Sequence, residues 1–304
     1  FVSKKQVFAS VFKDLSSLGD REKRFARYYD LTHLYNAGFE EDTLENYRLA
    51  LSKLVNSLSW NRQITPPKAI NKEKTVLRLD LRDYDWDRDT WGVIVRDYPY
   101  HINYDFEEYD RSTEVTTAAI PLIRADWFIA RAALPPLYHD ILELPQNDGE
   151  LESKLNIKVL QNITDSPGRK VWRSGFLKSG VSQFNRIVER HESPYGAYWK
   201  SYDFDSNEGF KNIFRYPYKF EFHHAGGEII FNLPNGLQAY LLTDEKGKRI
   251  DEAPVSIVSN RGNPNPVISN GLTCMACHTR GMKRLDFADE LHKAISVTEY
   301  ARER

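Results

Sequence analysis

The sequence predicts an α+β fold, with helices packed on a mixed or antiparallel sheet and a β-hairpin ahead of a cysteine motif near the C-terminal end. Apolar residues recur at helical spacing within the first 60 residues, whereas short runs around 75–81 and 228–243 have the composition and alternation of strands. Within the second run, Pro234-Asn235-Gly236 is a strong turn signal, which predicts two antiparallel strands joined by a tight hairpin.

The length of 304 residues allows one large domain or two smaller ones. The earlier segments have mainly helical patterns, and the later ones are mainly strand-like. We therefore expect a largely helical region at 1–170, with a strand near 75–81, and a second region at 171–304 that contains the hairpin and the cysteine motif. The two regions can also form one continuous domain.

The clearest helix in the first region lies before residue 60. Its apolar positions recur on one helical face, and Asp42 or Thr43 can cap its first turn; these positions are Leu44, Tyr47, Leu51, Leu54, Val55 and Leu58. Thr65-Pro66-Pro67 then breaks the helix. The alternation of Val76, Leu77, Leu79 and Leu81 predicts the strand that follows.

Two more helices are expected, from 115 to 134 and from 151 to 163. Pro121 can mark the start of the first, and Pro135-Pro136 stops it. The second ends at Ser166-Pro167-Gly168. We expect these helices to pack around a single sheet that contains strands 75–81, 229–233 and 237–243.

An irregular loop is expected before the cysteine motif and a helix after it. Residues 259–271, which are rich in Asn, Pro and Gly, predict an irregular loop. Apolar residues at helical spacing between 285 and 294 predict one more amphipathic helix.

Composition limits the kinds of partner. The 42 basic and 43 acidic residues are spread along the chain, so no basic stripe indicates nucleic acid binding. No run of 18 or more apolar residues is present, so no transmembrane segment is expected in this chain.

Both cysteines of the chain lie in one motif, Cys274-Met275-Ala276-Cys277-His278. The spacing C-x-x-C-H is that of covalent haem attachment, in which the two thiols form thioethers and the histidine binds the iron. We therefore expect one covalent haem c on Cys274 and Cys277, with His278 as the proximal axial ligand. A thioredoxin-like dithiol and half of a zinc site are the alternatives, and the sequence lacks the surrounding pattern that each requires.

Several segments around this motif resemble a group of bacterial extracytoplasmic proteins, frequent in planctomycetes, that carry a c-type cytochrome motif late in the chain. The matching segments are 79–84 (LDLRDY), 124–128 (RADWF), 135–140 (PPLYHD), 196–204 (GAYWKSYDF) and 226–238 (GGEIIFNLPNGLQ). The resemblance spans most of 28–282. It implies a c-type cytochrome and no particular reaction. Thioether attachment in bacteria also predicts a periplasmic or extracellular location.

The second axial position of the iron is harder to assign. A small class I cytochrome c uses a methionine well downstream of the motif, but Met275 and Met282 lie too close to His278, so that fold is not expected. Three of the seven other histidines are the distal candidates, and we favour such a second histidine over an open site. His224 precedes Gly226-Gly227, His139 follows Pro135-Pro136, and His191 is flanked by charged residues.

Three functions are compatible with these observations. Electron transfer to a redox partner protein or an adjoining domain comes first, because one c-type haem suffices for it. A haem enzyme of the peroxidase or oxygenase type, with an open or weakly ligated distal site, comes second, because the long region before the motif exceeds what burying one haem requires. A haem-containing binding or sensing protein is the third, with the aromatic segment 195–204 as a recognition surface.

Overall fold

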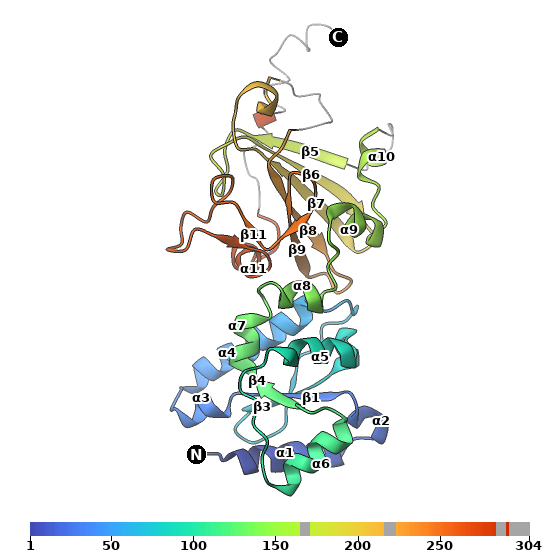
Figure 1. Cartoon of the computed structure of the whole chain (residues 1–304), viewed down its shortest axis with the longest axis vertical. Helices are drawn as coiled ribbons and strands as arrows, with labels where there is room; N and C mark the ends of the chain where they lie inside the picture. Colours follow the sequence, from blue (N-terminus) through green and yellow to red (C-terminus); the bar gives the residue numbers. More distant parts are fainter. Residues whose placement is uncertain (165–170, 216–222, 284–289, 292–304) are drawn as a thin grey trace. The chain divides into compact units, whose positions relative to one another are not determined.

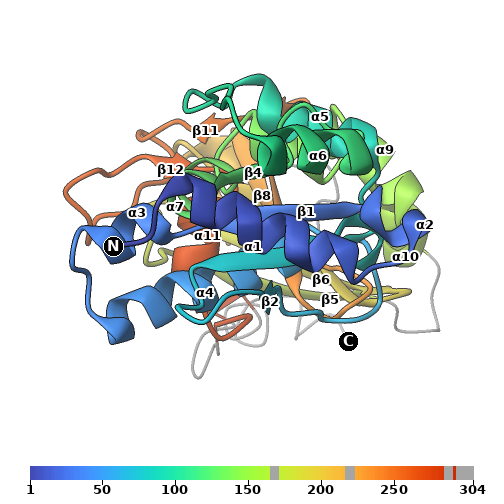
Figure 2. The same ribbon diagram turned by 90° about the horizontal axis from the view of Figure 1, so that it is seen from below.

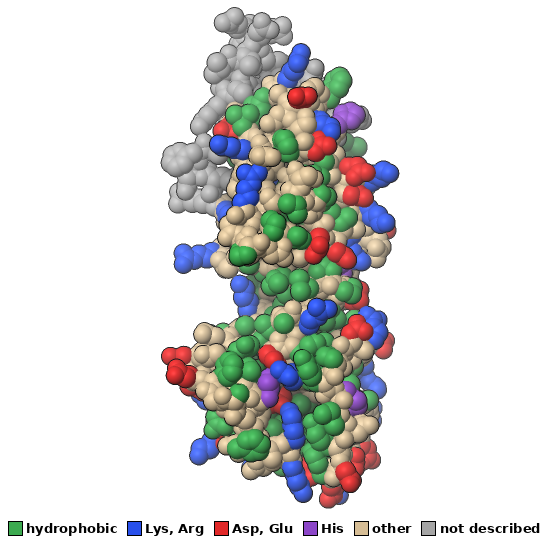
Figure 3. Space-filling model, turned by 60° about the vertical axis from the view of Figure 1, so that its left-hand side comes forward, with side chains coloured by type: hydrophobic (Ala, Val, Ile, Leu, Met, Phe, Trp, Pro, Cys, Tyr) green, Lys and Arg blue, Asp and Glu red, His purple; other side chains and the backbone are tan. Residues whose placement is uncertain are grey.

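The computed structural model (Figure 1) describes residues 1–164, 171–215, 223–283, 290 and 291. The chain forms two compact units, Phe1–Leu142 and Glu143–Arg304. Helices and sheets occur in both, so the fold is α+β and is not the all-helical fold of a small cytochrome c. None of the described helices is long and apolar enough to cross a bilayer. On the face drawn in Figure 3, acidic and basic side chains are interspersed in each unit.

The first unit contains a four-stranded sheet in the order β2-β3-β1-β4, with β1 antiparallel to β3 and parallel to β4. Its strands are β1 (Ala26–Asp30), β2 (Lys68–Ala69), β3 (Val76–Asp80) and β4 (Leu122–Arg124). Its helices are α1 (Lys4–Ser16), α2 (Asp20–Lys23), α3 (Thr32–Asn36), α4 (Glu41–Ser57), the 3₁₀-helix η1 (Leu81–Tyr84), α5 (Arg88–Arg96), α6 (Glu107–Thr116), α7 (Ala125–Arg131) and α8 (Leu137–Ile141).

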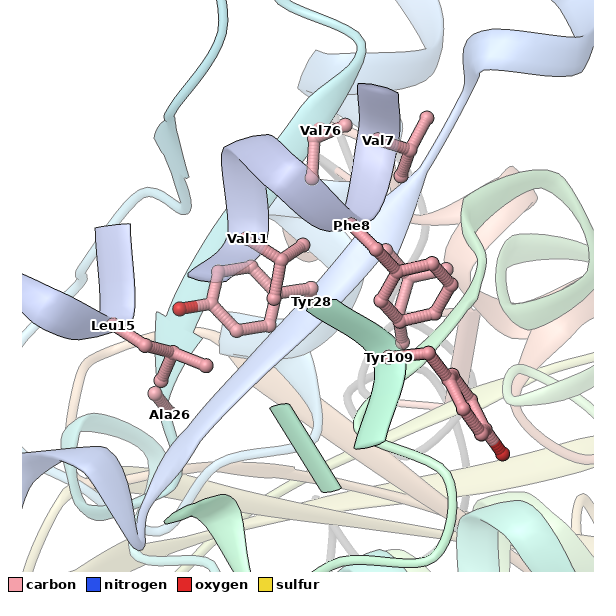
Figure 4. Close-up of a cluster of buried hydrophobic side chains, with 9 residues drawn as sticks. Val7, Phe8, Val11, Leu15, Ala26, Tyr28, Val76 and Tyr109 are labelled. Atoms are coloured by element: carbon pink, nitrogen blue, oxygen red, sulfur yellow. The ribbon is translucent and has the colours of Figure 1, made fainter. Parts of the chain in front are cut away.

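Helix α1 covers one face of this sheet. A capping box between Ser3 and Gln6 starts the helix, because each side chain bonds the backbone N–H of the other residue. The apolar stripe of α1 packs on β1 and on α6, as Figures 2 and 4 show. The buried cluster formed there contains Val7, Phe8, Val11, Leu15, Ala26, Tyr28, Val76, Tyr109 and Leu122. On the other face of β1, Tyr29 contacts Trp91 of α5 and Phe128 of α7 edge to face.

The second unit is built on a six-stranded antiparallel sheet in the order β10-β9-β8-β7-β6-β5, with a separate β11-β12 pair. Its strands are β5 (Val171–Phe176), β6 (Arg186–Ser193), β7 (Gly196–Asp203), β8 (Gly226–Asn232), β9 (Gln238–Asp244), β10 (Arg249–Ile250), β11 (Glu252–Ala253) and β12 (Ile268–Ser269). Its helices are α9 (Asp148–Lys154), α10 (Val159–Thr164), the 3₁₀-helix η2 (Gly209–Lys211) and α11 (Leu272–Cys277).

Side chains alternate between the two faces of this sheet, and the strand register tells which residues share a face. Trp199, Ile230 and Tyr240 lie directly opposite one another on β7, β8 and β9, and define what we call the cavity face. His191 pairs with Tyr198 and Tyr198 with Phe231, which places these side chains on the opposite face. Helix α9 is bonded to that opposite face, because Lys200 pairs with Asp148 and Glu152 at 2.8 Å and Tyr198 donates to Glu152.

Three sequence-based predictions are confirmed. Helix α4 covers the predicted segment before residue 60, and β3 occupies the strand expected at 75–81. Strands β8 and β9 form the predicted hairpin, in which Gly236 adopts the left-handed conformation, with φ 84°, that a side chain would strain.

Other predictions of helices and strands are wrong. The expected helix at 115–134 is divided. Helix α6 ends at Thr116, because Thr117 has a positive φ of 51°, and Leu122 then pairs with Tyr28 in a parallel ladder. The helix expected at 151–163 is similarly interrupted near Asn156, which has a φ of 52°. The first 60 residues contain β1 among their helices. The strands expected to share one sheet belong to two sheets, β3 to the first and β8 and β9 to the second.

The boundary between the units also differs from the expected one. It falls between 142 and 143 rather than between 170 and 171. The bonds from α9 to Tyr198 and Lys200 explain the difference, since they attach this helix to the second sheet. The amphipathic helix expected between 285 and 294 lies largely outside the described residues.

Candidate functional site

The cysteine motif forms the short helix α11. Gly271 precedes the helix with a φ of 88°, and the N–H of His278 donates to the carbonyl of Cys274 at 2.8 Å. Residues three apart lie on the same side of a helix. Cys274 and Cys277 therefore lie on one side of α11, both are free thiols, and both are half-buried.

Both cysteines and His278 line one cavity of about 330 Å³, within the range of about 300–1,000 Å³ that is usual for cofactor sites. Its other wall is the cavity face of the six-stranded sheet. The described residues that line it are Phe176, Lys178, Ser179, Gly180, Val181, Arg186, Val188, Trp199, Ser201, Glu228, Ile229, Ile230, Tyr240, Leu242, Asn260, Ile268, Thr273, Cys274, Cys277, His278, Met282 and Lys283. The motif thus faces a wall that is aromatic and aliphatic at its centre.

The imidazole of His278 is held in a defined orientation. Its Nδ1 lies 3.2 Å from the carbonyl oxygen of Gly281, which can only accept, so Nδ1 carries the proton and Nε2 keeps its lone pair. The ring of Tyr240 lies 6.1 Å from the imidazole between centroids. Burial lowers the pKa of His278, which favours the neutral imidazole that binds metals.

A cluster of charges forms one part of the cavity wall. Arg186, which is 9 % exposed, donates from Nη2 to Asp203 at 3.0 Å and to Glu228 at 2.7 Å. Burial alone would lower the pKa of Arg186, but the two carboxylates raise it above its ordinary value. Arg186 therefore stays cationic in this cluster.

The thiol of Cys274 is unlike the nucleophilic thiol of a redox-active dithiol. Burial, together with the nearby charge of Glu228, raises the pKa of Cys274 to about 12. Catalytic dithiols contain a thiol with a lowered pKa, because the thiolate is the nucleophile. In the described part of the chain, no group of three or more His, Cys, Asp or Glu side chains is arranged to hold a metal ion.

Two of the three distal candidates lie on the opposite face of the sheet. His191 is completely buried there, with its ring nitrogens 3.2 Å from Glu189 Oε2 and 3.2 Å from Asn162 Nδ2. His224 packs edge to face on Tyr202, whose hydroxyl donates to the same Glu189. The structure therefore places both histidines on the face of the sheet that is turned away from the cysteines.

His139 belongs to the first unit, where it is 2 % exposed on α8 beside Tyr138. Among the described residues that line the cavity, His278 is the sole histidine, and Met282, Lys178 and Lys283 are further side chains with sulfur or nitrogen donors. Met282 lies four residues after His278 in the chain. The turn at Gly281, with φ 86°, brings it to the same cavity.

The cavity wall was missed in the sequence because β5, β6 and β7 were not expected. In β7, Tyr198, Lys200 and Tyr202 share one face and Trp199 and Ser201 the other, so apolar and polar residues do not alternate strictly along this strand. Comparisons with protein-family models, with curated proteins and with solved structures gave no match.

Proposed function

We propose that the chain is an extracytoplasmic mono-haem c-type cytochrome that transfers electrons to a partner protein or an adjoining domain. The observation that supports this best is that Cys274, Cys277 and His278 all line one cavity opposite an aromatic and aliphatic wall. A porphyrin attached at the two sulfurs needs an apolar surface against its ring. Trp199, Ile230 and Tyr240 supply that surface in register across three strands.

Each residue of the motif has a definite part in holding the haem. Cys274 and Cys277 would form the thioethers, and His278, whose Nδ1–H donates to the carbonyl of Gly281, would bind the iron through Nε2. Lys178 and Lys283 line the same cavity and are exposed, so they can pair with the propionates. The bound haem supplies a one-electron iron couple.

A haem enzyme of the peroxidase or oxygenase type is the second candidate. The observation that favours it is the Arg186 cluster, which brings a guanidinium with two carboxylates to the cavity wall. Hydrogen-bond donors and polarity near the iron decide between electron transfer and activation of oxygen or peroxide. In this alternative, Arg186 would supply a positive charge and hydrogen-bond donors at the cavity wall.

The attachment chemistry is tested by expressing the chain in the periplasm of a bacterium that has a c-type maturation system. Haem should remain with the polypeptide in denaturing electrophoresis, and Cys274→Ser and Cys277→Ser together should abolish this. Met275→Ala, within the same helix, is the matched control and should retain haem. Haem that stays attached in the double serine variant, or wild type without attached haem, would refute the assignment.

Carbon monoxide then distinguishes the two candidates. A reduced carrier with two strong axial ligands binds it slowly, whereas an iron with an open position binds it at once. If carbon monoxide binds slowly to the wild type and rapidly to Met282→Ala, the result supports a carrier in which Met282 blocks access to the iron. Rapid binding by the wild type makes the enzyme the better proposal.

A further inference from the structure

The first unit contains a second cavity, of about 610 Å³, that is built entirely from its own residues. It lies beside the start of α5 and the segment after α6. Its described lining consists of Phe25, Arg27, Asp87, Arg88, Asp89, Trp91, Gly92, Val95, Thr117, Ala118, Ala119 and Ile120. One of these residues, Arg27, belongs to β1, an inner strand of the first sheet.

Arg27 is 1 % exposed and is incompletely hydrogen-bonded. Its Nη1 donates to the carbonyls of Arg24 and Ala26, at 3.1 and 2.8 Å. Its Nε is buried and has no acceptor in the described part of the chain, and no described carboxylate forms an ion pair with Arg27. Burial and the charge of Arg88 lower the pKa of Arg27 to about 10, so it is still cationic at neutral pH. A buried cation without an anion is costly unless a partner supplies the charge.

The open donor of Arg27 is accompanied by a rigid apolar wall. The guanidinium lies over the ring of Trp91, 5.6 Å from its centroid, and the Trp91 Nε1–H donates to the carbonyl of Ile120 at 2.9 Å. Val95 and Ala118 extend this wall. A ligand bound here would therefore meet cationic donors at one end and apolar side chains along its body.

Two acidic residues of the cavity lining discriminate between kinds of anion. The carboxylate of Asp87 already accepts from Thr90, at 2.7 Å from its backbone N–H, so the first turn of α5 is capped from within the chain. Asp87 and Asp89 both line the cavity and would repel a dianion such as phosphate more strongly than a monoanion. Arginine pairs with planar carboxylates through parallel N–H donors.

We propose that this cavity binds a small organic monocarboxylate, with its carboxylate on Arg27 and Arg88 and its apolar body against Trp91. This goes beyond the haem function and does not depend on it, because every residue involved lies in the first unit. Binding would give that unit a ligand of its own, and would give Arg27 the ion-pair partner that it lacks among the described residues.

The test is calorimetric titration of the purified full chain with benzoate, which carries one carboxylate on a planar apolar ring. Sodium chloride at equal ionic strength and inorganic phosphate are the comparison anions. Benzoate should bind with one-to-one stoichiometry, and Arg27→Met should weaken it at least tenfold. Arg62→Met, which removes an exposed arginine of the same unit, is the matched control and should leave binding unchanged.

A second variant distinguishes loss of binding from misfolding, in case Arg27→Met does not fold. A Cβ added at Gly92 meets no atom within 4 Å, so Gly92→Leu can be accommodated at its Cβ, places a larger side chain at the cavity wall and improves the helix propensity of α5. It should weaken benzoate binding at least tenfold while the thermal unfolding temperature is retained. Absent benzoate binding, undiminished binding in both variants, or tighter binding of phosphate than of benzoate would each overturn the proposal.

Discussion

The imidazole of His278 is oriented by the carbonyl of Gly281, three residues further along, at an Nδ1–O distance of 3.2 Å. Gly281 has a φ of 86°, a conformation that L side chains rarely adopt, so this bond depends on the absence of a Cβ. The geometry leaves Nε2 for a metal.

We therefore expect Gly281→Ala to lower the free energy of unfolding by about 1 kcal/mol. If haem is attached, the variant should also raise its reduction potential, because an imidazole that loses its Nδ1–H acceptor donates less electron density to iron. Urea denaturation and redox titration measure the two effects. Gly262→Ala is the control, since a Cβ there meets no atom within 4 Å, and it should change stability by less than about 0.5 kcal/mol. Equal effects of the two variants would contradict the orienting role of the turn.

Asp203→Asn should strongly destabilise the second unit. The substitution removes a negative charge from a buried arginine, and breaking a buried pair in this way costs about 3–5 kcal/mol. The control is Glu107→Gln, which removes one partner of an exposed pair with Arg111 and should cost less than about 1 kcal/mol. Chemical denaturation, monitored by near-ultraviolet circular dichroism, compares the free energies of unfolding of the two variants. Similar losses of stability would mean that the Arg186 cluster is effectively solvated.

Trp199→Ala should reduce the fraction of folded protein that carries haem. Trp199 lines the cavity, whereas Trp172 is 46 % exposed on the same face and lies outside the lining. Both rings contact Arg190, at 4.8 Å for Trp172 and 6.0 Å for Trp199, so Trp172→Ala is a matched control for that interaction. Haem absorbance per folded chain should fall in the first variant only. The assigned wall is refuted by an equal haem content in both.

His191→Gln should lower stability without altering the visible spectrum of a haem-loaded chain. Its hydrogen bonds to Glu189 and Asn162 lie on the face away from the cysteines, and losing buried bonds of this kind costs about 1–3 kcal/mol. His223→Gln, at an exposed histidine, should change neither quantity. A spectral change in His191→Gln would show that the histidine reaches the iron after all.

The Glu189 network predicts a loss of stability in acid. Burial alone would raise the pKa of Glu189, but the hydrogen bond from His191 and the charge of Arg173 lower it below the ordinary value. The unfolded chain therefore takes up the proton at a higher pH than the native chain does. The stabilisation is complete at neutral pH, begins to fall near the ordinary pKa, and is lost as pH drops through the lowered native pKa.

Glu189→Gln removes this titration. We expect it to be less stable than the wild type at neutral pH, by about 3 kcal/mol, and to lose less stability on acidification. Urea denaturation between about pH 7 and pH 3 measures both. Glu192→Gln changes an exposed carboxylate of the same strand and should retain the wild-type pH profile. A Glu189→Gln profile as steep as that of the wild type would assign the acid sensitivity to other groups.

Several features were predictable from sequence because they depend on residues close together in the chain. The spacing of Cys274 and Cys277 sets their separation on a helical turn, and Asn235-Gly236 marks a hairpin turn whichever sheet surrounds it. The apolar stripe of α4 likewise needs only one buried face. The segment around Leu122 was assigned to a helix because its apolar run fits either period, and its pairing with Tyr28 decided for a strand.

The sequence by itself thus determined the α+β class, the hairpin and the identity of a motif suited to covalent haem. Tertiary structure alone decided what surrounds that motif: Trp199, Ile230 and Tyr240 meet opposite it, and His191 faces away, because strand register assigns each side chain to one face of the sheet. It also decided that Arg27 is buried without an ion-paired carboxylate among the described residues, since burial and pairing depend on segments that are distant in the chain.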